Sequence, residues 1–380
     1  MADHAREILF VTWDGGGNVP PATAIAGELR RRGHRVRFVG HTSQRAPLEA
    51  QGFEVEPTTH ARPFAADDPQ SVLAMIRMFG DRGLGRDALA ALARRPADLV
   101  VVDCLLLGAM EELRRGSGGA GTPYVVLEHL YDAFFRRSFL RGPIGIGLRL
   151  MGLRRGASLD AARATLVACL PELDPAGQSP RHDVTYVGPV VTASPPVPGP
   201  PAVLVSLSTF AYPGMADCLQ RLLDATAGLD ARIVVTTGPH VDHARLRTAP
   251  HHELHAVVPH GELMPRVSLV VTHGGHGTTM RALAHDLPLV VMPMHPFVDQ
   301  PMIGRSVEHA GVGRMVAKKA SADALAPVIA ELLADGPHRA AAARLGAAIR
   351  AMPGATNAAD RIEVVLRDGA AAPGHRAARP

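Results

Sequence analysis

The chain has 380 residues, a formal net charge of +4 and a hydrophobic content of 47%. At this length two domains are expected rather than one. The positive charge is carried almost wholly by arginine, and no basic stripe interleaved with aromatic residues occurs, so nucleic acid is not an expected partner.

Cysteine usage and the ends of the chain bear on compartment. Cys104, Cys169 and Cys218 are odd in number and far apart, which favours reduced thiols in a cytoplasm over a disulfide framework. The N-terminal residues lead straight into a strand without a secretory signal, and the longest apolar run (99–110) contains an aspartate. We therefore expect a cytoplasmic protein without stable membrane insertion, and the sequence leaves a homodimer open.

The first half of the chain alternates strands and helices. Residues 7–13 read as a buried strand, 14–18 as a Gly-rich turn and 36–39 as the next strand, with a helix opened by Pro20 and Pro21 between them. This is the βαβ pattern of a parallel sheet, but GGGNVPP lacks the GxGxxG dinucleotide fingerprint. Helices are expected near 71–79 and 85–93, and strands at 98–102 and 123–127, which end at Asp103 and at Glu128-His129.

Residues 133–157 hold six arginines and no acidic residue. A membrane-surface helix is one interpretation of this segment. We prefer a mobile helical lid over an apolar pocket, because Pro143, Gly145 and Gly147 interrupt any long amphipathic helix.

A proline-dense stretch at 190–202 indicates a stiff linker, and strand–helix alternation resumes at residue 203. Strands are expected at 203–208, 233–238 and 255–259, with a helix at 215–227. A helical pattern covers 322–351, another covers 356–366, and the tail 369–380 reads as disordered.

The central motif of the second half is a His-Gly-Gly-His-Gly turn after a strand at 269–272, followed by a helix that starts near Thr278. Its glycines at 274, 275 and 277 let the backbone approach a ligand closely. The helix N-terminus presents free N–H groups that suit an anion such as phosphate, and His273 can add a proton donor. A further strand at 289–292 leads to the polar pair Asp299-Gln300.

These landmarks resemble the nucleotide-sugar-dependent glycosyltransferases of the GT-B fold. The resemblance includes LAxxLxxRGHxVxF-like phasing at 26–38, VGP at 187–189, VSLST at 205–209 and IVVTTG at 233–238. The similarity is to the bacterial branch that decorates small natural products. It implies an α/β fold with two Rossmann-like βα domains facing a cleft. The acceptor-binding domain is then 1–189, the linker 190–202 and the donor-binding domain 203–353. A C-terminal helix at 354–368 crosses back to the first domain, and 369–380 is the tail.

The resemblance also implies a donor site. It assigns the diphosphate to His273, to the turn formed by Gly275, Gly277 and Thr278, and to Thr209. The sugar hydroxyls fall to Asp299 and Gln300, the base to the backbone of Val258, and Gly238 to the same donor wall. The co-substrate is a UDP- or dTDP-linked sugar, with no other cofactor. No metal is expected, in agreement with the lack of an Asp-x-Asp motif. Two positions depart from the pattern: Arg281 replaces the usual ribose-binding Glu, and Ser208 replaces a Gly.

The catalytic base is the more serious departure. The family places a His three residues before the proline of the first turn, where this chain has Asn18, while the helper aspartate is present as Asp103. Asp14 is the first candidate for a replacement base and His129 the second; a turn-stabilising aspartate and a half-buried strand-end histidine are the structural alternatives. General base catalysis is worth roughly 10²–10⁴-fold. Its loss favours an acidic acceptor such as a phenol or enol, or carbon glycosylation of an activated ring.

We therefore expect an inverting, metal-independent glycosyltransferase that moves a hexose or deoxyhexose to a small hydrophobic acceptor of the phenolic or polyketide kind. The alternatives are a catalytically impaired auxiliary partner of another transferase and a nucleotide-sugar epimerase on the same fold. A metal site at His251, His252, His255 and His260 is rejected, because HHELH is not HExxH and a solvated polar loop explains it better. Neither a P-loop nor a GxSxG elbow is present.

Overall fold

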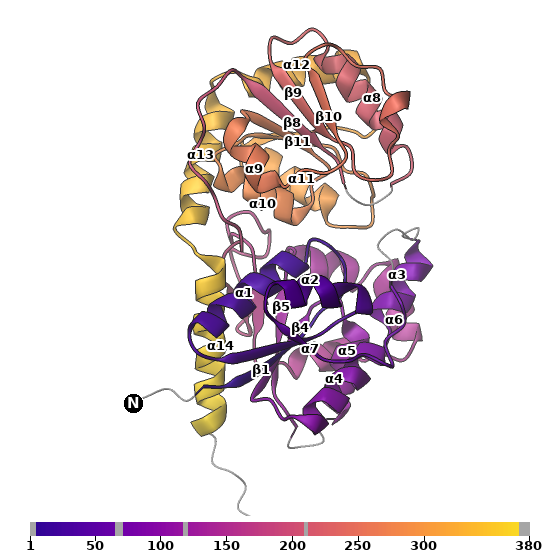
Figure 1. Cartoon of the computed structure of the whole chain (residues 1–380), viewed down its shortest axis with the longest axis vertical. Helices are drawn as coiled ribbons and strands as arrows, with labels where there is room; N and C mark the ends of the chain where they lie inside the picture. Colours follow the sequence, from indigo (N-terminus) through magenta and orange to yellow (C-terminus); the bar gives the residue numbers. More distant parts are fainter. Residues whose placement is uncertain (1–4, 65–70, 117–120, 209–211, 372–380) are drawn as a thin grey trace, which may run out of the picture.

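The computed structural model describes residues 5–64, 71–116, 121–208 and 212–371. It contains two α/β domains stacked end to end (Figure 1). The first has a seven-stranded sheet in the order β3-β2-β1-β4-β5-β6-β7, and the second a six-stranded sheet in the order β10-β9-β8-β11-β12-β13. Neighbouring strands pair in parallel throughout both sheets, which confirms the predicted fold class.

The strands of the first domain are β1 (Glu7–Val11), β2 (Arg35–Val39), β3 (Glu54–Val55), β4 (Leu99–Asp103), β5 (Tyr124–Glu128), β6 (Thr165–Val167) and β7 (Val184–Tyr186). Its helices are α1 (Val19–Arg31), α2 (Arg45–Ala50), α3 (Val72–Phe79), α4 (Gly83–Arg94), α5 (Leu107–Gly116), α6 (Pro143–Leu150) and α7 (Arg155–Asp160), with short turns η1 (Thr42–Gln44) and η2 (Phe134–Phe139).

The strands of the second domain are β8 (Ala202–Ser206), β9 (Arg232–Thr236), β10 (His252–His255), β11 (Leu269–Thr272), β12 (Leu289–Val291) and β13 (Gly313–Met315). Its helices are α8 (Met215–Thr226), α9 (His260–Leu263), α10 (His276–Ala284), α11 (Gln300–His309), α12 (Ala322–Leu333) and α13 (Pro337–Arg350), with turns η3 (His243–Arg245) and η4 (Met264–Arg266).

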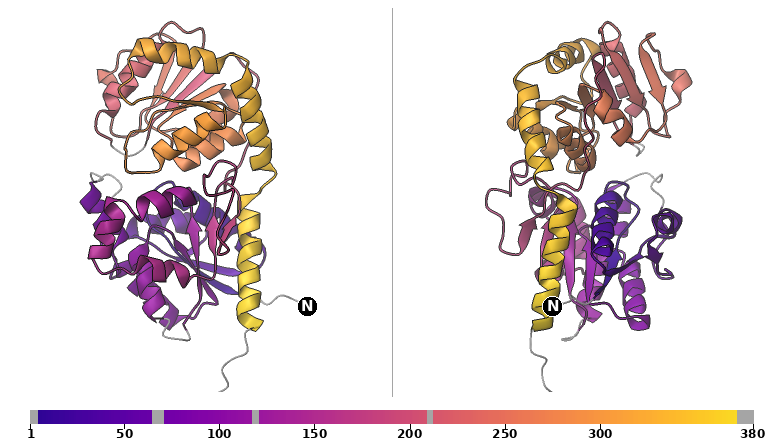
Figure 2. Two further views of the ribbon diagram at one scale, coloured as in Figure 1. Left: turned by 180° about the vertical axis from the view of Figure 1, so that it is seen from behind. Right: turned by 60° about the vertical axis from the view of Figure 1, so that its left-hand side comes forward.

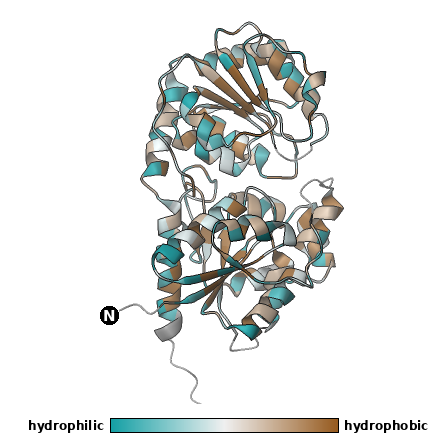
Figure 3. Cartoon of the chain, viewed as in Figure 1, coloured by the Kyte–Doolittle hydropathy of each residue, from teal (hydrophilic) through white to brown (hydrophobic). Residues whose placement is uncertain are grey.

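The central strands are mostly apolar because helices cover both faces of each sheet (Figure 3), and their polar residues, such as Glu7, Asp103 and Glu128, stand at the strand ends. Successive residues point to opposite faces, so Ile8 and Phe10 pack with α1 and the C-terminal helix, whereas Leu9 and Val11 pack with α4 and α5. The same alternation in β8 separates Val203, beneath α8 and α12, from Leu204 on the face covered by α10 and α13. This packing brings the carboxyl ends of both sheets to the space between the domains.

The chain crosses back to the first domain at its C-terminus. Helix α14 (Gly354–Ala371) follows α13 and lies along the first domain beside α1 (Figure 2). Arg32 donates to Asp360 at 2.6 Å and to Glu363 at 3.2 Å across this contact. The helix continues to Ala371, so residues 369–371 are helical where the sequence was expected to be a disordered tail. Residues 372–380 of that tail lie outside the described part.

Three expected elements differ from the structure. The strand expected at 255–259 lies earlier, at His252–His255, so the histidine-rich segment is the edge strand β10 rather than a polar loop. Its alternating half-buried and exposed residues gave no apolar signal. The helical pattern 322–351 is two helices, α12 and α13, and α10 begins at His276 rather than near Thr278.

Residues 133–157 form η2, α6 and part of α7, with Phe134, Phe139 and Ile144 buried toward the domain interior. Helix α6 packs against α3 and η2. Its role as a mobile lid stays a prediction. No helix in the described ranges is both long enough and apolar enough to span a bilayer.

Candidate active site

A cavity of about 530 Å³ lies between the two domains at the carboxyl ends of their strands. The first domain contributes an apolar wall and the second domain a polar one. The cavity includes nine of the residues predicted for the site: His129, Gly238, Val258, His273, Gly275, Gly277, Thr278, Asp299 and Gln300. Residue Thr209, also predicted there, lies outside the described residues.

The polar wall is organised by the turn between β11 and α10. Gly274 adopts φ +86°, and a Cβ there would lie 2.7 Å from Val291, so this glycine serves the turn rather than a ligand. Gly277 differs, because a Cβ at that position would meet nothing within 4 Å. The first turn of α10 therefore presents its unpaired N–H groups to open space in the cavity. This arrangement is suited to an anion.

Three basic side chains stand beside that helix terminus. Burial lowers the pKa of His273 to about 4, with a smaller contribution from His260, and burial together with Arg281 lowers the pKa of His260 to about 4. Both rings are therefore neutral at pH 7 unless an anion binds beside them. Burial also lowers the pKa of Arg281, which has no acidic partner within ion-pair distance among the described residues. The wall thus holds an uncompensated cation and two histidines whose pKa values a bound anion raises.

Asp299 and Gln300 begin helix α11 at the edge of the cavity. Burial raises the pKa of Asp299 to about 6, although His129 opposes the shift. The amide oxygen of Gln300 accepts from the backbone N–H groups of Met294 (2.7 Å) and His295 (3.1 Å), and its nitrogen donates to the Tyr212 hydroxyl at 3.0 Å. Gln300 therefore fixes the loop before α11 and leaves one N–H for a ligand.

The apolar wall comes from the loop after β1, from α3 and from the segments after β4 and β5. Trp13 packs edge-on against Phe79 at 5.5 Å between ring centroids, and Phe79 packs against Phe139 at the same distance. Met75, Met78, Leu105, Leu130, Phe134 and Ile144 complete the surface. Such a wall accommodates a flat, apolar ligand whose polar groups point toward the second domain.

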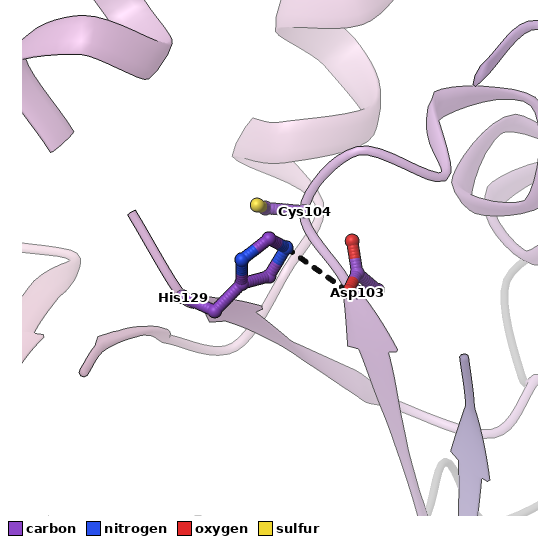
Figure 4. A group of neighbouring side chains, drawn as sticks. All are labelled: Asp103, Cys104 and His129. Carbon is purple, nitrogen blue, oxygen red and sulfur yellow. Dashed lines mark ion pairs between the residues drawn. The ribbon is translucent and has the colours of Figure 1, made fainter. Parts of the chain in front are cut away.

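The ends of β4 and β5 place a polar group at the floor of this wall. Asp103 Oδ2 accepts from Asn18 Nδ2 at 3.0 Å and lies 3.3 Å from His129 Nε2, while Asp103 Oδ1 accepts from the backbone N–H of Leu105 at 2.9 Å. His129 and Asp103 point toward one another, and the Cys104 side chain stands above them (Figure 4). Asn18 and Asp103 do not line the cavity, whereas His129 does.

Asp14, the first candidate for the base, is not brought into the site. Its Oδ2 accepts from Ser43 Oγ at 2.6 Å, and it is absent from the lining of the cavity although its neighbours Trp13 and Gly15 belong to it. The turn directs Asp14 toward η1. The expectation that Asp14 faces the reacting groups is therefore wrong for this conformation, and the structural alternative, a turn-stabilising aspartate, describes its contacts.

Sequence reasoning missed several lining residues. Trp13 was included in a strand without a role, and Tyr212 and His260 were given no place in the donor wall. The Ser206 hydroxyl lies 3.0 Å from His260 Nε2, which ties α9 to β8. Only the position of His260 after the expected strand at 255–259 could have drawn attention to it, because strand ends meet at the ligand edge of a parallel sheet.

Comparison with known proteins agrees with this architecture. Residues 220–365 match the family described as Erythromycin biosynthesis protein CIII-like, C-terminal domain. The chain is 28% identical to 4'-demethylrebeccamycin synthase of Lentzea aerocolonigenes, over 94% of this chain and 98% of that protein. It is 26% identical to demethyllactenocin mycarosyltransferase of Streptomyces fradiae, over 96% and 87%. The crystal structure of the kitacinnamycin glycotransferase superposes with a TM-score of 0.81 at 24% identity, covering 96% of this chain and all of that one.

The fold is therefore that of the GT-B glycosyltransferases, and the relatives that match nearly the whole chain identify the protein as a glycosyltransferase. Within that class, the chain is similar to glycosyltransferases of natural-product type, and its residues 220–365 resemble the EryCIII-like C-terminal domain.

Proposed function

We propose that this glycosyltransferase moves a hexose or deoxyhexose from a UDP- or dTDP-sugar to a small hydrophobic acceptor of the phenolic or polyketide kind. The proposal is supported above all by one cavity with two chemically distinct walls. The polar wall suits a nucleoside diphosphate and the apolar wall suits an aglycone. A ligand on each wall puts the two reacting groups next to each other, which is the proximity that group transfer requires.

The leaving diphosphate gains charge as the glycosidic bond breaks. The N–H groups of the first turn of α10, His273 and Arg281 are fixed donors aimed at that part of the cavity. Preorganised donors of this kind lower the barrier for charge development. Because the chain itself supplies a cation and a helix terminus there, we propose that the transfer proceeds without a metal ion.

Arg281 bears on which nucleotide the site prefers. Arg281 occupies the position where the family resemblance expects a carboxylate for the ribose hydroxyls. A guanidinium has no acceptor, so it could hold a ribose hydroxyl only through the hydroxyl oxygen, which is a weaker partner for a cation than a phosphate oxygen. We propose that Arg281 binds a phosphate instead, and that the site gains little from a 2'-hydroxyl. This supports a preference for dTDP over UDP.

Inversion follows from the arrangement of the walls in this proposal. The acceptor lies on the first domain and the diphosphate on the second, so the acceptor oxygen reaches the anomeric carbon from the side opposite the leaving group. A single displacement then inverts the configuration. An anomeric assignment of the product by its proton coupling constants tests this point.

The function is tested by nucleotide binding and then by turnover. A ligand that binds only the folded state raises the midpoint of unfolding by mass action, so dTDP and UDP should raise it, whereas NAD should not. Release of dTDP or UDP from the sugar nucleotide should depend on an added phenol. His273→Ala should lose most of both effects, and His309→Ala, an exposed histidine on α11, should lose neither.

Two results overturn the proposal. Full turnover in His273→Ala removes the assigned donor site. The absence of a midpoint shift with any nucleotide favours the auxiliary-partner alternative, in which the chain stabilises another transferase.

A further inference from the structure

We propose that His129, oriented by Asp103, is the general base that takes the proton of the acceptor hydroxyl, and that Asn18 is a positioning residue for this pair. The inference rests on the proposed function, because it concerns the same reaction. It moves the base from the N-terminal turn of α1, where the family resemblance expects it, to the end of β5. Asp103 keeps its place while its histidine partner comes from another strand.

Asp103 is held in a single orientation by three contacts. Oδ1 accepts from Leu105 N–H, and Oδ2 accepts from Asn18 while facing His129 Nε2 at 3.3 Å. The side chains of Asp103 and His129 are 5% and 12% exposed, so water competes little for this contact. A carboxylate fixed at both oxygens can orient an imidazole without moving itself.

His129 Nε2 lies 3.3 Å from Asp103 Oδ2 without meeting hydrogen-bond geometry. We propose that a small rotation of the ring when the acceptor binds lets Nε2–H donate to the carboxylate, which leaves the lone pair on Nδ1. Nδ1 lies on the side of the ring away from Asp103 (Figure 4). His129 lines the cavity between Leu105 and Leu130 of the apolar wall and Asp299 of the polar wall. A hydroxyl on an acceptor bound to the apolar wall is therefore near an imidazole that can accept its proton once the pH exceeds the pKa of His129.

The transfer step balances in protons and electron pairs with the acceptor, the sugar nucleotide and His129 alone. The acceptor O–H bond breaks and its proton goes to His129 Nδ1. The oxygen forms a bond to the anomeric carbon, and the bond from that carbon to the diphosphate oxygen breaks with its electron pair on the diphosphate. His129 ends protonated beside the Asp103 carboxylate, which stabilises the imidazolium.

The charges around His129 suit this role. Burial by itself lowers the pKa of His129, but the nearby carboxylate of Asp103, together with that of Asp299, outweighs burial and the pKa is raised. The other titratable groups facing it are His276, whose pKa burial and His129 lower to about 3, and the Cys104 thiol. A raised pKa makes the imidazole a stronger base, and it restricts activity to pH values above that pKa.

Asn18 cannot replace this function, because an amide does not accept a proton at neutral pH. Its side chain is instead fully engaged: Oδ1 accepts from Gly15 N–H at 3.1 Å, and Nδ2 donates to Asp103, to Trp13 O at 2.9 Å and to Thr12 Oγ1 at 3.2 Å. It joins the first turn to Asp103 and leaves the second lone-pair direction of Oδ2 for His129.

A metal ion is the competing explanation for this cluster, since donor atoms of Asp103, Cys104 and His129 lie within 4.8 Å of one another. The hydrogen bonds disfavour it. Both oxygens of Asp103 already accept N–H groups, and the completely buried Cys104 has a pKa raised well above that of a free thiol by burial and by Asp103. A protonated thiol and an occupied carboxylate are poor ligands.

The test uses acceptors of graded acidity. We would measure kcat and KM for a series of para-substituted phenols, from 4-methoxyphenol to 4-nitrophenol, with dTDP-glucose and UDP-glucose as donors. His129→Gln keeps an amide N–H for Asp103 but removes the base. We expect kcat to fall by about 10²–10⁴-fold for the least acidic phenols and much less for 4-nitrophenol. KM and the midpoint shift produced by nucleotide should change little.

Two further measurements separate catalysis from folding. Wild-type kcat should rise with pH through a limb that His129→Gln abolishes. Asp103→Asn should shift that limb to lower pH, because the carboxylate that raises the pKa of His129 is gone. The third test adds EDTA at about 1 mM to the wild type and to His129→Gln. Unchanged turnover of both proteins supports His129 as the base. Loss of turnover in the wild type alone supports a metal ion.

The outcomes are distinguishable. If the wild type releases no nucleotide with any phenol, the proposed function fails. If it does and His129→Gln is unimpaired, or is impaired by the same factor for every phenol, the base assignment is overturned. A uniform factor indicates a structural role.

Discussion

Arg281 offers the sharpest test of the donor wall, because its removal should change stability and binding in opposite directions. The guanidinium lines the cavity, burial lowers its pKa, and no acidic side chain among the described residues pairs with it. A partly desolvated cation without a partner is costly in the empty protein. Arg281→Met keeps much of the apolar stem and removes the charge.

The expected magnitudes follow from the contact that Arg281 is proposed to make. A hydrogen bond to a charged group contributes about 1.5–3 kcal/mol, so the Kd for dTDP should rise about 10- to 150-fold. In the empty protein the same change should stabilise the fold by about 1 kcal/mol, since the desolvation cost of a half-buried charge disappears. Removal of Arg281 also removes one cause of the low pKa of His260, which should rise.

Thermal unfolding with and without dTDP measures both effects in one experiment, calorimetric titration gives the Kd, and NMR titration gives the pKa of His260. Arg314→Met is the matched control, because Arg314 lies in the same domain and pairs with Glu331 at 2.7 Å near the surface. An unchanged Kd for dTDP in Arg281→Met, or a lower midpoint of the empty protein, would refute the assignment of Arg281 to the phosphates.

Two other predictions concern the same cavity. Gly277→Val should weaken dTDP binding by about tenfold or more with little change in the midpoint of unfolding. The valine side chain enters open space at the N-terminus of α10 and blocks the N–H groups proposed to bind the diphosphate. Gly261→Val is the control, because a Cβ there also meets nothing within 4 Å, and equal affinities of the two variants for dTDP would contradict the assignment. Burial raises the pKa of Asp299 to about 6, so the folded state binds its proton more tightly than the unfolded state and stability falls as pH rises from about 4 to 6. Asp299→Asn should therefore match the wild type in stability at pH 4 and exceed it at pH 7.5 by at most about 3 kcal/mol in denaturant titrations, whereas equal stability at both pH values would contradict the raised pKa.

The sequence predicted those parts of the fold in which several residues carry one signal. The strands before Asp103, His129 and His273 are continuous apolar runs of four or five residues that end in a polar side chain, and each lies where it was expected. Parallel pairing then requires their ends to share one edge. By contrast β13 (Gly313–Met315) consists of a glycine, an arginine and a methionine, so it has no apolar run to recognise, whereas β12, of the same length, is wholly apolar.

The candidate site could be predicted only in part, for a physical reason. Helix termini and glycine turns are backbone features that local sequence determines, so the β11–α10 turn could be placed. Side-chain direction within a loop depends on tertiary contacts: Asp14 turns to Ser43, and Gln300 turns inward to Tyr212. The contact between His129 and Asp103 joins the ends of two strands, and its geometry depends on the register of β4 with β5.

The family resemblance suggests that Asn18→His should restore a missing base, and the structure predicts the opposite. Asn18 is 1% exposed and satisfies Gly15 N–H, Trp13 O, Thr12 Oγ1 and Asp103 together. An imidazole is larger than an amide and cannot make all four contacts, so at least one buried group loses its partner at a cost of about 1–3 kcal/mol.

The new ring would also compete with His129 for Asp103 Oδ2, because both nitrogens approach the same oxygen. We therefore expect Asn18→His to lower the midpoint of unfolding and to lower kcat with weakly acidic phenols. Asn18→Leu, which is similar in size and adds no charge beside Asp103, tests the loss of the amide. Measurement of kcat in Asn18→His and in Asn18→His/His129→Gln decides between the two views. If the single variant is faster than wild type and the second substitution has no further effect, residue 18 is the better position for a base and His129 is not its replacement. If the single variant is slower and the double variant slower still, the proton still leaves through His129.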